Sequence, residues 1–212
     1  MVTNDGVIAS SYLVATQNEL PLPAHDQTKN PSAEVIEQRM KYILEQLNRF
    51  MGVNTYHVLS DPTGTYIGHI DCWGKFLDDH TVLIAEPDNE KIKIGLNHIA
   101  TQFKEWEFHV FRVKCQDIYL PQVAPPDNAT TAAYTNSLIL NDHVYVPIVG
   151  PPHEDHDRNA LAVYQSALPH HTIVGIPAKY DTPWLGTDAL HCRTHEVPRE
   201  VVDNWLRSRA PQ

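Results

Sequence analysis

The fold assignment depends most on residues 137–148, which read SLILNDHVYVPI. Two apolar runs flank the pair Asn141-Asp142, and residues of this kind favour the tight turn of a hairpin. The segment therefore predicts two antiparallel strands. A helix over residues 157–168 and a strand over 172–176 are predicted to follow, so the whole unit has the order strand–strand–helix–strand.

Two similar units precede this one in the chain. Their helices show apolar residues at steps of three and four, and their strands are short apolar runs. The predicted elements are strands over residues 6–14, 55–59, 81–85 and 108–113, helices over 31–50 and 89–106, and a last short helix over 198–205. One such unit cannot bury its own apolar faces, so units of this kind stack or close on themselves. A doubly wound parallel sheet is the alternative, but the hairpin favours modules that contain antiparallel strands.

The composition narrows the class of protein. The chain has 212 residues, of which 42% are hydrophobic, and this is enough for one large domain or two small ones. Its net charge is −10 and no Lys/Arg run stands out, so nucleic acids and anionic membranes are poor candidates for partners. No stretch is long enough to cross a bilayer, and no secretion signal follows Met1. The sequence does not indicate the cellular compartment of the protein.

Polar residues follow the returning strand of each unit. His69 and Asp71 come after the first, Asn136 after the second and Cys192 after the third. In α/β folds, functional residues gather on loops at one end of the strands. If the units are arranged around an axis, these three loops meet at one centre.

These residue types are the parts of a thiol-based catalyst. Cys192 would be the nucleophile, with the thiolate as the attacking form. His191 and His195 flank it and His69 could approach it, and an imidazolium in any of these places would lower the pKa of the thiol and exchange protons. Asp71 would point to the same side as His69 in extended backbone and could bind a cationic substrate group. Asn136 would offer an amide for orientation.

Each candidate has a plainer alternative. A lone cysteine is more often a small buried hydrophobic residue than a nucleophile, and we expect Cys72 and Cys115 to be structural. Three cysteines at unrelated spacings argue against a disulfide framework. The run HEDHD, residues 153–157, contains metal-binding residue types. It precedes a predicted helix, so we favour an acidic first helical turn capped by Asp155 or Asp157.

Three ordered motifs carry a family resemblance. They are YIGHIDCWGK at residues 66–75, YTNSLILN at 134–141 and DALHCRTH at 188–195. The chain resembles the Porphyromonas-type peptidylarginine deiminases, relatives of the agmatine deiminases within the guanidino-modifying superfamily. The resemblance implies an α/β propeller, the pentein fold, built from five strand–strand–helix–strand modules. About three of them would be present here, in a single catalytic domain over residues 1–212.

The resemblance also implies a reaction. Cys192 would attack the guanidinium carbon of arginine, and a thiouronium intermediate would yield citrulline and ammonia. His69 would protonate the leaving ammonia and then activate water, while Asp71 would hold the guanidinium and Asn136 would match an active-site asparagine. The residues that would line the substrate are Tyr66, Ile67 and Thr187. No cofactor and no metal are implied.

The expected substrate is an arginine-containing peptide, with agmatine as the alternative and an inactive fragment as a third possibility. In the family an upstream segment resembling Trp-x-Arg-Asp-x-Gly-Pro supplies a second guanidinium-binding carboxylate, and none occurs between Met1 and His69. We therefore expect an N-terminally incomplete domain with little activity. Propeller modules without their neighbours have open strand edges, which predicts self-association.

Overall fold

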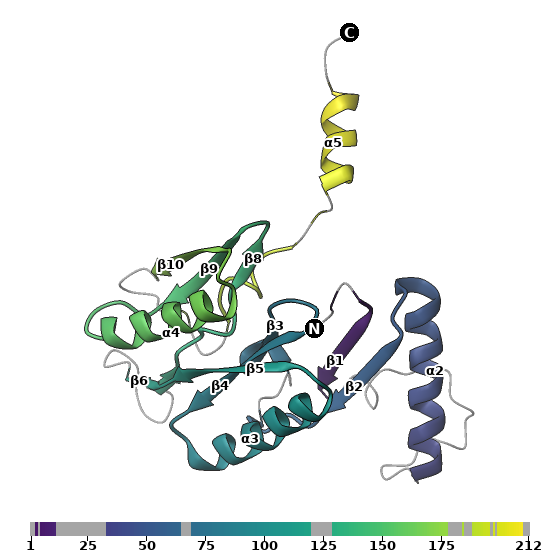
Figure 1. The fold of residues 1–212 in the computed structure, drawn as a ribbon, viewed down its shortest axis with the longest axis horizontal. Coiled ribbons are helices and arrows are strands. Elements are labelled where there is room, and N and C mark those ends of the chain that lie inside the picture. The colour runs from purple at the N-terminus through teal and green to yellow at the C-terminus, as the bar shows by residue number, and fades with distance from the viewer. Residues whose placement is uncertain are drawn as a thin grey trace.

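The structure, a computed structural model, describes residues 3, 5–11, 33–64, 69–119, 129–177, 184, 188–195, 197 and 199–209. Within this part of the chain the strands form four small separate sheets, and the helices, apart from the last one, lie beside them (Figure 1). The expectation of an α/β fold is confirmed. A single doubly wound sheet is excluded for these strands, because strands of different units do not pair with one another.

The middle unit has the order strand–strand–helix–strand. Its elements are β3 (Gly74–Phe76), β4 (Thr81–Pro87), α3 (Glu90–Glu105) and β5 (His109–Cys115). β4 pairs antiparallel with β3 and parallel with β5. Asn89 begins the helix as the sequence predicts, because its side-chain oxygen accepts hydrogen bonds from the backbone N–H groups of Lys91 and Ile92. The strand β3 was not expected.

The third unit repeats this order. Its elements are β8 (Leu138–Leu140), β9 (His143–Ile148), α4 (Glu154–Ala167) and β10 (Thr172–Pro177). β8 and β9 form the predicted antiparallel hairpin, with Asn141 at the turn in the left-handed region at φ 54°. β10 returns parallel to β9, so the unit matches the prediction from residues 137–148.

The first unit is described in part. Its elements are β1 (Val7–Ser11), α2 (Ala33–Met51) and β2 (Thr55–Leu59), and the two strands pair in parallel. Gly52 follows the helix with a φ of 71°, where a side chain would be strained, and this ends α2 as the sequence predicts. The predicted start of that helix at Pro31 lies outside the described residues.

Two further elements complete the described fold. β6 (Asp117–Tyr119) pairs antiparallel with β7 (Ala129–Thr131), a pairing that the sequence pattern did not indicate. The last helix, α5 (Arg199–Ser208), is confirmed near its predicted position. It stands apart from the sheets and the other helices (Figure 1), and none of its side chains is buried.

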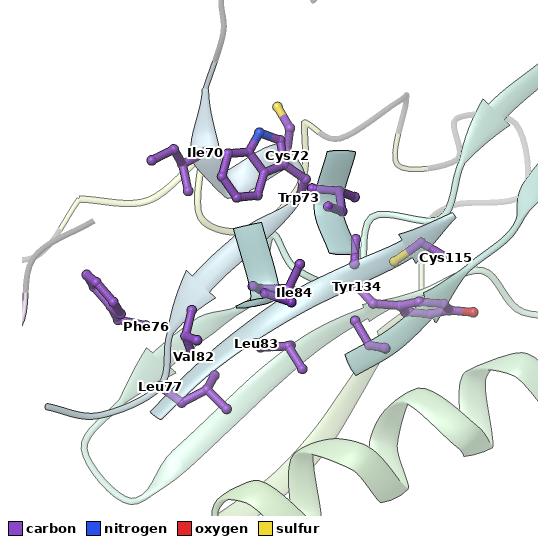
Figure 2. Packing of buried hydrophobic residues seen from close by; sticks show 14 of the residues in the cluster. Ile70, Cys72, Trp73, Phe76, Leu77, Val82, Leu83, Ile84, Cys115 and Tyr134 are labelled. Atoms are coloured by element: carbon purple, nitrogen blue, oxygen red, sulfur yellow. The ribbon is translucent and has the colours of Figure 1, made fainter. Parts of the chain in front are cut away.

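The core is centred on β4. Val82, Leu83 and Ile84 are fully buried, and each such side chain contributes about 1.5–3 kcal/mol through removal from water. In Figure 2, Val82 lies towards one end of β4, and Cys115 and Tyr134 lie together towards the other. α4 of the third unit packs against β5 of the middle unit, which joins the two units into one body.

Candidate active site

The first part of the site is a tight turn at the start of the middle unit. Ile70–Cys72 forms one turn of 3-10 helix, in which Cys72 N and Trp73 N donate to His69 O and Ile70 O. The expected extended backbone at this point is therefore wrong, since these local bonds bend the chain. Trp73 is almost fully buried and anchors the turn in the core (Figure 2).

Asp71 projects from this turn, and its side chain is 13% exposed. Its backbone carbonyl accepts a hydrogen bond from Thr135 Oγ1 at 3.1 Å, which attaches the turn to the segment before β8. Asn136, which follows Thr135 in the sequence, donates from Nδ2 to Asp71 Oδ2 at 3.0 Å. The first two predicted loops therefore meet through direct hydrogen bonds.

Asn136 also holds the loop that carries the cysteine. Its Nδ2 lies 3.1 Å from Cys192 Sγ, and its Oδ1 accepts from the backbone N–H groups of Ala189 and Cys192 at 3.0 and 3.1 Å. Its backbone carbonyl accepts from His191 N. The Asn136 side chain is completely buried, so a single amide joins three segments that are far apart in the sequence.

A second layer of buried polar side chains supports Asn136. Tyr164 Oη lies 2.8 Å from both Tyr134 O and Ser137 Oγ, and Tyr134 donates to Asp157 Oδ1 at 2.8 Å. Burial is the main cause that raises the pKa of Tyr134 and of Tyr164, so both stay neutral donors. The sequence predicts the helix that carries Tyr164, but nothing in its pattern indicates a hydrogen bond to the site.

Asp157 differs from its predicted role. The N-cap of α4 is His153, which makes no side-chain capping bond, so neither Asp155 nor Asp157 is the cap. Asp157 is buried instead, and its carboxylate accepts from Val149 N and Gly150 N at 2.9 and 2.8 Å. It stabilises the preceding turn because these backbone N–H groups need acceptors when they are buried.

The carboxylate of Asp71 has two histidine neighbours. His191 Nδ1 lies 2.7 Å from Oδ2, and His69 Nδ1 lies 3.9 Å from Oδ1. Burial acts to raise the pKa of Asp71, but hydrogen bonds from His191 and Cys192 and the charges of both histidines lower it to about 2. The group is therefore an anion at neutral pH, as cation binding requires.

Cys192 lies at the surface, and its Sγ is 3.2 Å from Asp71 Oδ2. Partial burial raises the pKa of this thiol, and the charges of Asp71 and Asp188 add to the rise against the lowering effect of the Asn136 bond. We expected a neighbouring imidazolium to lower it. That expectation is wrong for this arrangement, because the His191 ring contacts Asp71.

The other cysteines fit a structural role. Cys72 and Cys115 are buried, and burial raises the pKa of Cys115 to about 12. Among the residues that the structure describes, no group of three or more His, Cys, Asp or Glu side chains is arranged to hold a metal ion. In the same residues no helix is long and apolar enough to span a bilayer.

The described residues bring together most of the predicted catalytic set. Asp71, Asn136 and Cys192 are in mutual contact, and His69 lies beside Asp71 with its ring 58% exposed. His191 was expected beside the thiol and is found on the carboxylate. The predicted substrate-lining residues Tyr66, Ile67 and Thr187 lie outside the described residues.

Solved structures share this fold. The agmatine deiminase of C. jejuni superposes with a TM-score of 0.63 at 19% identity, over 89% of this chain and 50% of that one. The agmatine deiminase of Enterococcus faecalis gives a TM-score of 0.57 at 19% identity, over 90% and 53%. The protein therefore has the pentein fold. The chain spans about half the length of these structures.

The family follows from the sequence match. Residues 24–198 match the model of the Porphyromonas-type peptidyl-arginine deiminases, and the chain belongs to that family. A Vibrio parahaemolyticus protein named "Putative agmatine deiminase" is 37% identical over 68 residues. That alignment covers 32% of this chain and 18% of the relative. The resemblance expected from the three motifs is confirmed.

Proposed function

We propose that this chain is part of an enzyme that hydrolyses a guanidinium group to a ureido group and ammonia. One observation carries the proposal: the Cys192 thiol, the Asp71 carboxylate and the Asn136 amide lie within hydrogen-bonding distance of one another. A carboxylate binds the cation, a thiolate attacks its carbon, and a rigid amide orients both groups.

The first half of the reaction forms a bond to sulfur. The guanidinium donates to Asp71, and its positive charge beside Cys192 lowers the thiol pKa, which burial and the charge of Asp71 raise in the absence of ligand. The thiol gives its proton to His69, directly or through water, and the thiolate then attacks the guanidinium carbon. The C–S bond forms, the C–N bond breaks, and ammonia leaves with a proton from His69, which gives a thiouronium.

The second half releases the product. His69 takes a proton from water as the oxygen attacks the thiouronium carbon. The C–O bond forms, the C–S bond breaks with its electron pair going to Cys192, and the remaining hydroxyl proton passes to the released thiolate or to solvent as the ureido C=O forms. The His69 ring is 58% exposed and lies 3.9 Å from Asp71 Oδ1, a position that suits exchange of protons with solvent beside the bound cation.

Agmatine is the proposed substrate and N-carbamoylputrescine the product. The supporting observation is that the relatives and the superposed structures are named agmatine deiminases. An arginine-containing peptide, our first expectation, is the second candidate, supported by the description of the matching family. The net charge of −10 suits a cationic substrate of either kind.

The test is a search for the covalent intermediate. The protein is mixed with agmatine, free arginine or an arginine peptide, quenched in acid and analysed by mass spectrometry, while ammonia is measured in parallel. We expect an adduct on Cys192 from agmatine that lacks one ammonia, and none in Cys192→Ala.

The remaining alternative is that the chain keeps the fold but catalyses no reaction. Normal labelling of Cys192 by iodoacetamide, with no adduct and no ammonia from any of the three substrates, would replace the proposed function with this one. The variant His98→Ala serves as the matched control, since His98 is exposed on α3 and lies outside the cluster around Asp71.

A further inference from the structure

One oxygen of Asp71 carries three donors. Oδ2 lies 2.7 Å from His191 Nδ1, 3.0 Å from Asn136 Nδ2 and 3.2 Å from Cys192 Sγ. A carboxylate oxygen has about two lone-pair positions for donors. Oδ2 therefore has no room for a fourth donor in this arrangement.

The three donors are not equally fixed. Asn136 is completely buried and makes further bonds at both ends of its amide, so it cannot leave. The backbone of Cys192 is tied to Asn136 Oδ1. The His191 side chain is 51% exposed. Its backbone is held by the bond from its N–H to Asn136 O and by bonds from Thr194 N and Oγ1 to its carbonyl. None of these bonds involves the ring, which can therefore rotate about its side-chain torsions.

We infer that His191 occupies, in the ligand-free protein, the position on Asp71 that a guanidinium takes, and that ligand binding displaces the His191 ring. The identity of the ligand rests on the proposed function. The exchange of the His191 ring for a guanidinium follows from the positions of Cys192 and Asp71. Cys192 Sγ contacts Oδ2, so a guanidinium whose carbon faces that sulfur also donates to Oδ2.

The two donors have matching chemistry. Imidazole N–H and guanidinium N–H groups are both flat, and both make their strongest hydrogen bonds to carboxylates when charged. One can therefore replace the other without leaving the buried oxygen of Asp71 short of a donor. His191 then sets the affinity for cations, because every ligand must first displace it.

Affinity labelling of Cys192 tests this inference. Chloroacetamidine is a flat cation that donates to carboxylates, and chloroacetamide is its neutral analogue. The ratio of their labelling rates at Cys192, read by peptide mass spectrometry, reports cation binding at Asp71. In His191→Ala we expect this ratio to rise about three- to tenfold, since a charge-assisted hydrogen bond no longer competes.

Two controls bracket the result. His98→Ala should leave the ratio as in the original chain, and Asp71→Asn should reduce it whether His191 is present or absent. A ratio that stays level or falls in His191→Ala overturns the inference, because His191 would then support the carboxylate and not compete for it. Failure of both reagents to label Cys192 overturns it too, since no ligand could then reach that pair of groups.

A second measurement follows the ring itself. Nitrogen-labelled histidine resonances are recorded while methylguanidinium is added, and His191 is assigned by its loss in His191→Ala. We expect the His191 signal to shift with saturation in the original chain and to stay still in Asp71→Asn. Neither experiment needs turnover. If the His191 signal shifts but no substrate is hydrolysed, only the proposed function is contradicted. If substrate is hydrolysed but the His191 signal does not respond to methylguanidinium, only this inference is contradicted.

Discussion

The Asn136 side chain contacts Cys192 at both ends of its amide. Oδ1 accepts from Cys192 N at 3.1 Å, and Nδ2 lies 3.1 Å from Cys192 Sγ. The amide therefore fixes the backbone of the nucleophile and offers a hydrogen bond to its sulfur. A donor of this kind stabilises the thiolate more than the thiol, so it acts against the effect of burial and of Asp71 on the thiol pKa.

The first prediction concerns Asn136→Asp. This change keeps the shape and the acceptor for Cys192 N, but it removes the donor and adds a carboxyl group about 3 Å from Asp71. We expect the thiol pKa to rise, iodoacetamide labelling at pH 8 to slow and adduct formation to fall by about a hundredfold. Asn159→Asp on the exposed face of α4 is the matched control. Equal labelling rates in the two variants would contradict the prediction.

Asp71→Asn should have the opposite effect on the thiol. Removing the anion next to Cys192 lowers the thiol pKa, so more thiolate is present at any pH below it. We expect a severalfold faster reaction with neutral iodoacetamide at pH 8, together with loss of the agmatine adduct. A slower reaction would show that Asp71 does not raise the pKa of Cys192.

Acid stability should also depend on Asp71. Its pKa in the folded state is about 2, below the ordinary 3.8, so its contribution is complete above pH 3.8 and is lost as the pH falls towards 2. The shift corresponds to about 2 kcal/mol in the free energy of unfolding. Urea unfolding at pH 5 and pH 2.5 should therefore show a smaller acid loss in Asp71→Asn than in the original chain. Glu105→Gln, at an exposed position, should keep the full loss.

Tyr134→Phe tests the buried layer behind the site. The change removes the hydroxyl that donates to Asp157 Oδ1 at 2.8 Å and leaves a buried carboxylate with one donor fewer. We expect the free energy of unfolding to fall by about 1–3 kcal/mol, measured by urea titration at pH 7. Tyr42→Phe on α2, where the ring is partly exposed, should change it little. If Tyr134→Phe costs no more stability than Tyr42→Phe, the bond from Tyr134 does not stabilise Asp157, and its backbone donors alone are sufficient.

The last prediction concerns association of the chain with itself. α5 exposes an apolar face on which Val201 is 55%, Trp205 53% and Leu206 54% exposed. Such a face is covered when two copies meet, because removal of apolar surface from water is favourable. We expect light scattering to show a dimer or larger species, and Trp205→Glu with Leu206→Glu to reduce it. Asp203→Asn, on the same helix, should not. A monomer at all concentrations would overturn the expectation.

Local patterns predicted the larger elements well. The helix α3 was expected between Asn89 and Trp106, and these residues are its caps, because helical periodicity and capping depend on neighbours in the sequence. The strands β3, β6 and β7 were missed. Each has three residues and exists through pairing with a partner strand, which no short window of sequence contains.

The site was predictable in its members and not in its contacts. The positions of Asp71, Asn136 and Cys192 after successive strands indicated that their loops would meet, and they do. The sequence could not show that His191 contacts Asp71 across 120 positions, or that the thiol pKa is raised. Both depend on which groups become neighbours after folding, and spacing carries no information on this.

The bond between Cys192 and Asp71 closes a loop of 121 residues. Closing such a loop costs entropy that only the completed structure offsets, while the hairpins and helices of each unit form from near neighbours. We therefore expect the thiol to reach its final surroundings last during refolding. Its reactivity then serves as an internal reporter of complete assembly, able to distinguish a finished molecule from one whose separate units have formed but have not yet joined.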